Sequence, residues 1–510
     1  MVLALFAFLL AAIPATIAQL NCSSGINPMC EVAAGLVFPS SFNKTVFGWE
    51  CSNGQPINSV CTWAAVSCYT GTSIMAAIIS GIQGRTLLAG VQGTLSPYIG
   101  CESNLAVLIL IDTQLTGSIP SELGLITGGR FGTLGLDNNQ LQGSIPSALG
   151  GITSLATVSI ASNQLTGSIP SELGHLTKLS GLDLTTNRLT GTIPSTLGLL
   201  TKLTLLDLSI NSITGPIPSE LGLLTSLKAL SLANNHLNSS IPSAIGSWTA
   251  LTFLNLGFNS FTGPIPTQIG QMTNLKLVEM SEASLSGNLP TELGELIALT
   301  RLDVSYNNIT GTVPTQLGQL SSLTYLAMSV NSLTGPLPAQ LGNLTNLAEL
   351  HADNNQLSSK LPSEIGGMSH LSVLYLQHNQ LQGTIPTEIG QLISLTNLDL
   401  DTNAFIGTIP STLVDLTRLQ VLLLQSNHLT GTIPALPTSL IELSVSTNHL
   451  GGAIPSQLGE LRNLTNLDIS VNSFTSHIPS AIFSNLTNLA ALGAGSFSGG
   501  NVIGKFTISN

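Results

Sequence analysis

The sequence predicts an α/β solenoid, in which short parallel strands stack into one curved sheet and short helical or 3-10 turns form the outer side. Three observations favour this fold. A unit of 24 residues recurs through most of the chain, as the spacing of Asn163, Asn187 and Asn211 shows. Each copy alternates apolar and polar residues over a strand-length segment, and its apolar face is buried only when neighbouring copies stack.

An asparagine marks the same place in almost every copy. Its position advances by 24 residues per copy, with one copy skipped at Ala283 and one shorter step of 21 residues from Asn427 to Asn448. Thr113 and Phe497 take its place in an early copy and in the final one. The full series is Asn139, Asn163, Asn187, Asn211, Asn235, Asn259, Asn307, Asn331, Asn355, Asn379, Asn403, Asn427, Asn448 and Asn472.

Each segment of the unit has a role that its residues explain. LxxLxL predicts a strand with one buried face, and the asparagine amide can satisfy backbone groups where the chain leaves that strand, so stacked asparagines should form a ladder. LTGxIP supplies a glycine for a tight bend and a proline that starts the next element. SELGxL predicts one short helical turn, with serine as its cap and glycine as its terminator.

The complete pattern, LxxLxLxxNxLTGxIPxxLGxLxx, resembles the plant-type extracellular leucine-rich repeat over residues 105–494. The resemblance implies a right-handed, curved superhelix with the parallel sheet on its concave face. We expect a signal peptide over residues 1–18, a cysteine-containing N-terminal cap over 19–70, an irregular first repeat over 71–104, tandem repeats over 105–488 and a degenerate last repeat over 489–510.

The segment before the repeats also resembles the N-terminal cap of that family. Trp49-Glu50-Cys51 and the CTWAAVSC segment from Cys61 to Cys68 are similar to its W…C and CxWxGVxC motifs, with Ala65 where glycine is usual. By this resemblance, Glu31 to Phe38 form the helix of the cap.

The N-terminus and the cysteines indicate export. Met1 to Ala18 is an apolar segment ending in small residues, which predicts a signal peptide cleaved before Gln19, with an uncleaved anchor as the alternative. An even number of cysteines suits disulfides in an oxidising compartment; 15 pairings are possible, Cys61–Cys68 is the first expectation, and metal ligation is the rival interpretation. The six cysteines are Cys22, Cys30, Cys51, Cys61, Cys68 and Cys101.

Charge and hydropathy limit the function classes. The 510 residues include 13 Lys and Arg against 25 Asp and Glu, a net charge of −12, which argues against a nucleic-acid partner. Mean hydropathy is positive, yet no apolar run after the signal peptide is long enough to span a membrane. Kinase motifs and a lipid-anchor signal are absent from the sequence, so the chain resembles secreted repeat proteins such as the polygalacturonase-inhibiting proteins of plants.

In the LxxLxLxxN segment the leucine positions are expected to point inward and the intervening positions outward onto the concave sheet, which solenoids use to bind ligands. From Ala156 to Phe258 they hold mostly small residues, together with Asp183 and Asp207. From Leu275 onward they become charged and aromatic, which is typical of an interface. The predicted ligand-binding residues are Glu279, Glu282, Arg301, Asp303, Tyr306, Tyr325, Glu349, His351, Asp353, Tyr375, His378, Asp399 and Asp401.

Two alternatives apply to single residues of this face. Aspartates in LDL or LDV segments, such as Asp303 and Asp399, recur with the repeat and can belong to the scaffold. His351, Asp353 and His378 could suggest a metal site, but histidines a whole repeat apart are a weak signal. We therefore predict no catalytic, cofactor-binding or metal-binding residues.

Hydroxyl groups recur beside the LTG bend and could form a flat ladder that matches a polysaccharide or an ice plane. The column is interrupted, which favours a purely structural role at the bend. The interrupting residues are Pro216, Pro264, Asn288, Pro336 and Lys360.

N-x-S/T sequons predict glycosylation if the chain is exported. None occupies an outward position of the strand segment, so the concave sheet would stay open to a partner. The predicted sites are Asn43, Asn238, Asn308, Asn343, Asn463 and Asn485, and Asn21 begins a seventh sequon.

The leading functional hypothesis is a secreted or cell-surface protein that binds a protein or peptide ligand through the concave face, in signalling or defence, alone or with a membrane co-receptor. The alternatives are an inhibitor of a secreted cell-wall hydrolase and a structural or adhesion protein that binds polysaccharide or ice. No enzymatic activity and no cofactor are predicted.

The last copy predicts a weak end of the solenoid, because a terminal repeat exposes unpaired backbone groups and a bare core edge. Leu489 and Leu492 can pack on the preceding copy, Phe497 could cover the core edge, and Phe506-Thr507-Ile508 could fold back over it. We expect this end to unfold first on heating or to stack against another chain.

Overall fold

The computed structural model describes residues 36–37, 51–52, 55–56, 66–68, 74–80, 92–95, 99–100, 105–493 and 505–507. The chain divides into two compact units, unit 1 (Met1–Asn238) and unit 2 (Ser239–Asn510). The predicted signal peptide and Asn21, Cys22, Cys30, Asn43, Cys61, Cys101 and Phe497 lie outside the described residues, and only the backbone of Cys51 and Cys68 is described. The predicted disulfides therefore stay predictions.

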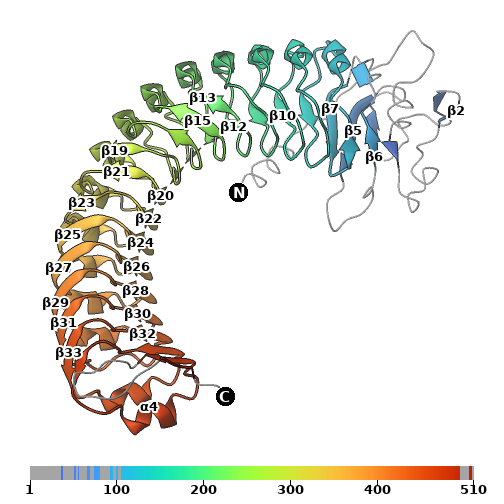
Figure 1. Ribbon diagram of the computed structural model, residues 1–510. Coiled ribbons are helices and arrows are strands. Elements are labelled where there is room, and N and C mark those ends of the chain that lie inside the picture. The colour runs from blue at the N-terminus through green and yellow to red at the C-terminus, as the bar shows by residue number, and fades with distance from the viewer. Residues whose placement is uncertain are drawn as a thin grey trace. The chain divides into compact units, whose positions relative to one another are not determined.

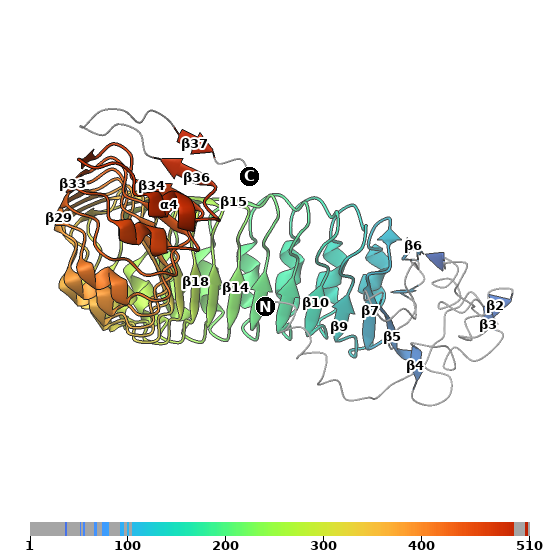
Figure 2. The ribbon, with the colours of Figure 1, turned by 90° about the horizontal axis from the view of Figure 1, so that it is seen from below.

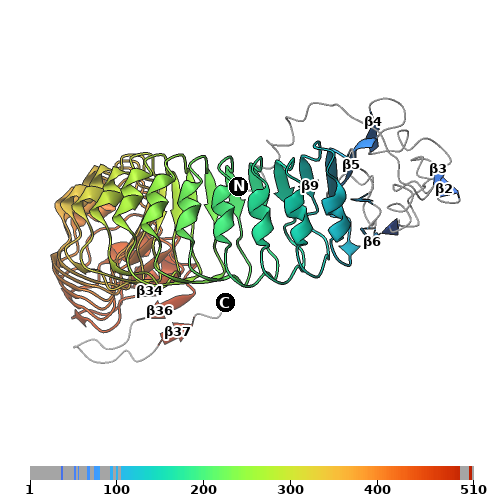
Figure 3. The same cartoon turned by 90° about the horizontal axis from the view of Figure 1, so that it is seen from above.

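Unit 1 is built on a sheet formed by the LxxLxL segments, as predicted. Its register places equivalent repeat positions side by side, so that the buried Val158 pairs with Leu134 and Leu182. The strands face the viewer in Figure 2, and the helical turns face the viewer from the opposite side in Figure 3. After an antiparallel β4–β5 pair the sheet is parallel, with strands β4 (Val66–Cys68), β5 (Ile74–Ser80), β7 (Val107–Ile111), β9 (Thr133–Gly135), β10 (Thr157–Ser159), β11 (Gly181–Asp183), β12 (Leu205–Asp207) and β14 (Ala229–Ser231).

Unit 2 repeats this arrangement along its own sheet. Leu326, Leu350 and Leu374 pair in register and are almost completely buried, and the strands from β22 to β30 lie along the inner side of the unit in Figure 1. The strands are β16 (Phe253–Asn255), β18 (Leu277–Glu279), β20 (Arg301–Asp303), β22 (Tyr325–Ala327), β24 (Glu349–His351), β26 (Val373–Tyr375), β28 (Asn397–Asp399), β30 (Val421–Leu423), β32 (Glu442–Ser444), β34 (Asn466–Asp468), β36 (Ala491–Gly493) and β37 (Lys505–Thr507).

The predicted helical turns are 3-10 helices, apart from one short α-helix. In unit 1 they are η3 (Ser121–Leu125), η4 (Ser147–Gly151), η5 (Ser171–His175), η6 (Ser195–Leu199) and η7 (Ser219–Leu223). In unit 2 they are η8 (Ser243–Ser247), η9 (Thr267–Gln271), η10 (Thr291–Glu295), η11 (Thr315–Gln319), η12 (Ala339–Asn343), η13 (Ser363–Gly367), η14 (Thr387–Gln391), η15 (Ser411–Asp415), η16 (Ser456–Glu460) and α4 (Ser480–Asn485).

The roles predicted for serine and glycine in these turns were wrong. In η5 the residue before the helix is Pro170, whose carbonyl accepts from Leu173 N–H, and no side chain caps the turn. Gly174 lies inside the turn, where a Cβ would come within 2.4 Å of the Thr196 carbonyl oxygen of the next repeat. The glycine therefore permits close stacking of successive turns, because any side chain would collide with backbone.

The LTG segments, which were predicted only to bend, form additional parallel strands. In unit 2, seven of them make one sheet, β23-β25-β27-β29-β31-β33-β35. Proline after the glycine shortens a strand because it has no N–H to donate: β23 ends at Gly335 before Pro336, whereas β29 continues through Gly407 to Thr408. These strands are β17 (Ser260–Phe261), β19 (Ser286–Asn288), β21 (Asn308–Thr310), β23 (Thr334–Gly335), β25 (Gln356–Lys360), β27 (Gln380–Thr384), β29 (Ala404–Thr408), β31 (His428–Gly431), β33 (His449–Gly452) and β35 (Ser473–Phe474).

The remaining strands include one that corrects the expected cap helix. Leu36 and Val37 form β1, which pairs antiparallel with Gly93 and Gln92 of β6 instead of being helical. Backbone hydrogen bonds at the edge of the three-stranded sheet β1-β6-β8 hold them extended, as suits a β-branched valine. The strands are β1 (Leu36–Val37), β2 (Cys51–Ser52), β3 (Gln55–Pro56), β6 (Gln92–Thr94), β8 (Leu115–Thr116), β13 (Thr214–Gly215) and β15 (His236–Ser239).

The predicted asparagine ladder is confirmed. The Asn163 amide donates to the carbonyls of Leu136 (2.9 Å), Ala161 (3.0 Å) and Ile160 (3.3 Å), and its oxygen accepts from Leu141 N–H at 3.0 Å. Each asparagine thus joins its own repeat to the preceding one. The residue before each ladder asparagine has a φ between 48° and 55°, the left-handed region that is uncommon for residues other than glycine.

At Ala283 the ladder has no asparagine side chain, and a backbone carbonyl replaces one of the bonds that the asparagine would make. Phe261 N–H donates to the Ala283 carbonyl at 3.0 Å, where other repeats use an asparagine oxygen. Asn307 of the next repeat accepts from Ala283 N–H and Leu285 N–H. The stack therefore continues through this repeat with fewer side-chain bonds.

The C-terminal strand folds back, as predicted. β37 pairs antiparallel with β36, with Phe506 opposite Leu492, and the two strands lie side by side in Figure 2. This pairing covers backbone groups that the last parallel strand would otherwise expose. Within the described part of the chain, no helix combines the length and the apolar character that crossing a bilayer requires.

Candidate functional site

The predicted binding residues of unit 2 meet around Arg301, at the start of β20. Its Nε lies 2.5 Å from Glu279 Oε1, and its Nη2 lies 3.5 Å from Asp303 Oδ2. The guanidinium also lies over the Tyr325 ring, 3.5 Å from the ring centroid, in cation–π geometry. Two carboxylates and an aromatic face therefore hold one half-buried cation in place.

The contacts continue along the sheet through three aromatic side chains. The His351 ring lies 5.3 Å from the Tyr325 ring and 5.1 Å from the Tyr375 ring, and it meets Tyr375 edge to face. His351 Nε2 lies 3.0 Å from Glu349 Oε2. We call Arg301, Tyr325, His351 and Tyr375 the aromatic row. It crosses four successive strands, β20 to β26.

Burial changes the acidity of the groups along the row. Loss of hydration raises the pKa of the Tyr325 and Tyr375 phenols, so both stay protonated at neutral pH and can act as hydrogen-bond donors. Burial also raises the pKa of Glu279, against the opposing effect of Arg301. The row therefore presents phenol groups and a compensated cation, not a free positive charge.

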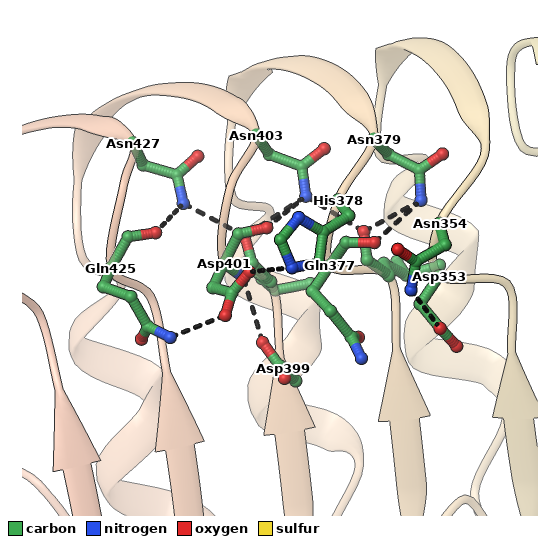
Figure 4. A network of polar contacts seen from close by, with 12 residues as sticks. Asp353, Asn354, Gln377, His378, Asn379, Asp399, Asp401, Asn403, Gln425 and Asn427 are labelled. Carbon is green, nitrogen blue, oxygen red and sulfur yellow. Dashed lines mark hydrogen bonds and ion pairs between the residues drawn. The ribbon is translucent and has the colours of Figure 1, made fainter. Parts of the chain in front are cut away.

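A second cluster lies where the chain leaves β26, β28 and β30 (Figure 4). Asp401 Oδ2 accepts from Gln425 Nε2 at 2.6 Å, and Asp401 Oδ1 lies 3.8 Å from His378 Nε2. Three buried oxygens here, Gln377 Oε1, Asp401 Oδ1 and Gln425 Oε1, have no hydrogen-bond donor. His378 is therefore an ion-pair partner of Asp401 whenever its imidazole is protonated.

Several predicted binding residues also support the backbone. Asp303 Oδ1 accepts from Ser305 N–H and Asp399 Oδ1 accepts from Asp401 N–H, each at 3.0 Å. Burial raises the pKa of Asp399 to about 7. Asp353 accepts from the Ser329 hydroxyl and from Asn354 Nδ2. The scaffold alternative considered for the LDL aspartates therefore describes what Asp303 and Asp399 do.

Glu282 and Tyr306 do not join these clusters. Each precedes its repeat's ladder position in the left-handed conformation, at φ 51° and 55°, beyond the end of its strand. The Tyr306 side chain is 56% exposed. His378 occupies the same repeat position at φ 54° but reaches Asp401. The prediction grouped all three with the outward residues of the concave face, and the structure places them beyond the ends of their strands, directly before the ladder position.

Sequence reasoning missed the amide partners of the charged residues. Gln425 bonds Asp401, and Asn466 Nδ2 donates to Glu442 Oε1 at 2.6 Å in the last strands. These residues occupy the same outward positions as the predicted ones. Their repeat positions alone point to them, but an amide side chain lacks the charge or aromatic ring that marks the predicted residues.

The strand face of unit 1 has no comparable row among its described side chains. Its outward aspartates, Asp183 and Asp207, are 5% and 3% exposed and accept from the N–H groups of Thr185 and Ser209. Burial raises the pKa of both, that of Asp183 to about 7. The outward aspartates of this face therefore hydrogen-bond to the backbone of their own repeats.

Family models match much of the chain. The leucine-rich repeat region model matches residues 263–383 and 360–501, and the single leucine-rich repeat model matches residues 154–176, 202–224, 226–248 and 250–272. No curated protein matches the chain significantly.

Solved structures with the same fold include plant receptor ectodomains. The plant peptide hormone receptor RGFR1, in complex with RGF2, is 32% identical with a TM-score of 0.64, and the match covers 80% of this chain and 73% of that one. The ectodomain of GASSHO1/SCHENGEN3 from Arabidopsis thaliana, in complex with CASPARIAN STRIP INTEGRITY FACTOR 2, is 31% identical with a TM-score of 0.59, over 92% of this chain and 64% of that one.

A third structure contains both a ligand and a second receptor. The Arabidopsis receptor kinase HAESA, in complex with the peptide hormone IDA and the co-receptor SERK1, is 29% identical with a TM-score of 0.50, over 92% of this chain and 94% of that one. Together with the repeat pattern, the ladder and the parallel sheet, these similarities show that the chain belongs to the leucine-rich repeat family, in its plant-type form.

Proposed function

We propose that the chain is an extracellular recognition protein that binds a peptide ligand through the strand face of unit 2. The observation that carries this proposal is the aromatic row, which gathers one guanidinium, two phenols and one imidazole on four adjacent strands. Tyrosine and arginine are the residues that most often dominate binding energy at protein interfaces. An extended peptide lying along the sheet could contact all four side chains.

The solved relatives support a peptide as the ligand. The peptide hormone receptor RGFR1 was solved with RGF2, GASSHO1/SCHENGEN3 with CASPARIAN STRIP INTEGRITY FACTOR 2, and HAESA with the peptide hormone IDA and the co-receptor SERK1. By analogy, we propose a signalling role in which a membrane co-receptor joins the ligand-bound chain. No similarity favours the alternative of a hydrolase inhibitor.

The experiment compares ligand capture by matched variants of the exported chain. Tyr325→Ala, Tyr375→Ala and Glu349→Lys alter the row or its edge. The controls are Glu364→Lys, the same charge change on the exposed turn η13, and Phe483→Ala, which removes a 61% exposed aromatic ring from α4. A peptide selected from a library by the unaltered chain serves as the probe in a fluorescence-anisotropy titration.

We expect each row variant to weaken peptide binding at least about tenfold, which is the loss of about 1.4 kcal/mol or more typical of an interface hot spot. The two controls should bind as the unaltered chain does. If Tyr325→Ala, Tyr375→Ala and Glu349→Lys all bind the peptide as tightly as the unaltered chain does, the ligand lies elsewhere.

A second candidate function rests on a groove in unit 1. A hollow of about 1390 Å³ is lined by hydroxyls at one position of successive repeats, Ser118, Ser144, Ser168 and Thr192, with Glu122 and Glu172 beside it. Regularly spaced hydroxyls can match a repeating polysaccharide. A glycan array probed with the exported chain tests this role, and Ser144→Val with Ser168→Val should abolish any signal that arises in the groove.

Glycosylation stays a prediction that fits this proposal. Asn238, Asn308, Asn343, Asn463 and Asn485 are all exposed. Asn343 ends the turn η12, and none of the five lies in a strand of the long sheets. Intact mass before and after glycosidase treatment of exported material would identify the sites that carry glycans.

A further inference from the structure

Two histidines outside the binding face are stacked on neighbouring repeats. His428 begins β31 and His449 begins β33, each directly after a ladder asparagine. Their ring centroids lie 5.7 Å apart and their planes are inclined by only 10°. Both side chains are exposed, and neither imidazole has a hydrogen bond or an ion pair with the described residues, in contrast to His351 and His378.

The local repeat brings the two rings together. The step from His428 to His449 is 21 residues, and β31 and β33 pair in parallel with Thr430 opposite His449. Elsewhere this repeat position holds a histidine only at His236, whose counterparts in the flanking repeats are Ser212 and Ser260. Adjacent imidazoles therefore occur at one place among the ladder repeats.

The pair borders a hollow of about 550 Å³. Its walls include the hydroxyl groups of Ser426, Thr447 and Ser473, and the residues that line it, all in the described range, contain no Lys, Arg, Asp or Glu. A bound group could therefore interact with two imidazole nitrogens and several hydroxyls or waters. No fixed positive charge is present to hold an anion.

We propose that His428 and His449 form a binding site for a divalent transition-metal cation of the zinc or copper class. Neutral imidazole is a preferred ligand of these cations, and each ring has one nitrogen with a free lone pair. Metal–nitrogen bonds of about 2.0 Å require the exposed rings to turn toward one another, which their freedom from other partners allows. Water completes the coordination, with the hydroxyls around the hollow holding that water.

Protonation of the two imidazoles should prevent metal binding. Two imidazolium rings at this distance would repel each other, and a proton on the coordinating nitrogen excludes the metal. Protons and the metal compete for the same nitrogens, so metal binding must be weaker at acid pH. An anion held by two protonated rings would show the reverse dependence.

The test titrates the full chain with Zn²⁺ by calorimetry at pH 7.5 and at pH 5.5, and records the electron paramagnetic resonance spectrum of the Cu²⁺-loaded chain. We expect His428→Ala and His449→Ala each to weaken Zn²⁺ binding about tenfold or more, and each to remove one nitrogen coupling from the Cu²⁺ spectrum. His236→Ala, at the same repeat position without a histidine neighbour, is the matched control and should change neither result.

His428→Gln and His449→Gln keep a polar side chain of similar size. Circular dichroism melts of these variants check that the chain is still folded. Unchanged Zn²⁺ affinity in the His428→Ala, His449→Ala double variant overturns the proposal. So does Zn²⁺ binding that strengthens at pH 5.5, or inorganic phosphate binding at pH 5.5 in a chain that binds no metal at pH 7.5.

Discussion

The strand faces of unit 1 and unit 2 have the same backbone but use their outward side chains differently. In unit 1, Asp183 and Asp207 are buried against the N–H groups two residues ahead. In unit 2, Arg301, Tyr325 and His351 bond mainly to side chains of neighbouring strands. Outward residues of a repeat fold therefore contact one another across strands only where they are larger than the backbone bonds require.

The two units share the ladder, and its loss should have the largest effect. Asn163→Ala in unit 1 and Asn355→Ala in unit 2 each remove the bonds of one ladder amide and leave one buried N–H, that of Leu141 or of Leu333, without its acceptor, whereas the carbonyls keep a second donor. We expect each to lower the free energy of unfolding by about 3 kcal/mol, because an unsatisfied buried group costs about 1 to 3 kcal/mol and each further lost hydrogen bond about 1 kcal/mol. Urea denaturation measures this, and a much smaller loss in one unit would break the equivalence of the two scaffolds.

The buried aspartates sharpen the comparison through pH. The pKa of Asp183 in unit 1 and that of Asp399 in unit 2 are both raised to about 7 by burial. A raised pKa means that the folded state holds the proton more tightly than the unfolded state, so this stabilisation is complete below about pH 4 and is lost as pH rises to 7.

Asp183→Asn and Asp399→Asn should each remove part of that pH dependence. An asparagine oxygen can still accept from Thr185 N–H or from Asp401 N–H. At pH 8 each variant should be more stable than the unaltered chain, by roughly 2 to 4 kcal/mol at most. Thermal melts from pH 4 to 8 measure this, and melting temperatures that rise with pH in the unaltered chain would contradict it.

The aromatic row should give unit 2 an interaction free energy between Arg301 and Tyr325 that unit 1 lacks. A double-mutant cycle with Arg301→Met and Tyr325→Leu should yield a coupling of about 1 kcal/mol, as expected of a partly exposed cation–π pair. The same cycle at the equivalent positions of unit 1, Gly181→Ala and Leu205→Ala, should give a smaller value. Equal couplings would mean that the row adds nothing to the sheet beyond ordinary packing.

The smallest expected effect concerns the left-handed position before the ladder asparagine. Ile210 in unit 1 and Val471 in unit 2 hold φ angles of 54° and 52° with β-branched side chains that are half exposed. Asparagine tolerates this conformation better, so Ile210→Asn and Val471→Asn should each stabilise the chain by about 1 kcal/mol. A loss of stability in either variant would show that the exposed apolar group contributes packing that outweighs its strain.

The fold could be predicted from the sequence because the same residue pattern recurs in every repeat. The strand segments, the ladder and the returning strand at residues 505–507 could all be inferred from positions alone. The second sheet was missed because its strands, of two to five residues after a bend, are too short to show a periodicity of their own. Gly174 was misread for a similar reason, since its role depends on Thr196 of the next repeat.

The site was harder to predict than the fold. Sequence position identified Arg301, Tyr325, His351 and Tyr375 as outward residues, but which of them meet depends on side-chain rotamers across strands. Position alone also grouped Glu282 and Tyr306 with the outward residues of the strands, because no residue type marks the left-handed turn before the asparagine.

The missing ladder residue at Ala283 has a consequence for cooperativity. In a stacked repeat protein, each repeat is stabilised by its interface with its neighbours, and unfolding spreads until an interface is weak enough to stop it. Across the interface between the Asn259 repeat and the Ala283 repeat, the Phe261 N–H to Ala283 carbonyl bond stands in for the bonds of a ladder asparagine. We therefore expect this interface to be weaker than its neighbours and to be a place where unfolding of unit 2 stops, with the whole aromatic row on its C-terminal side.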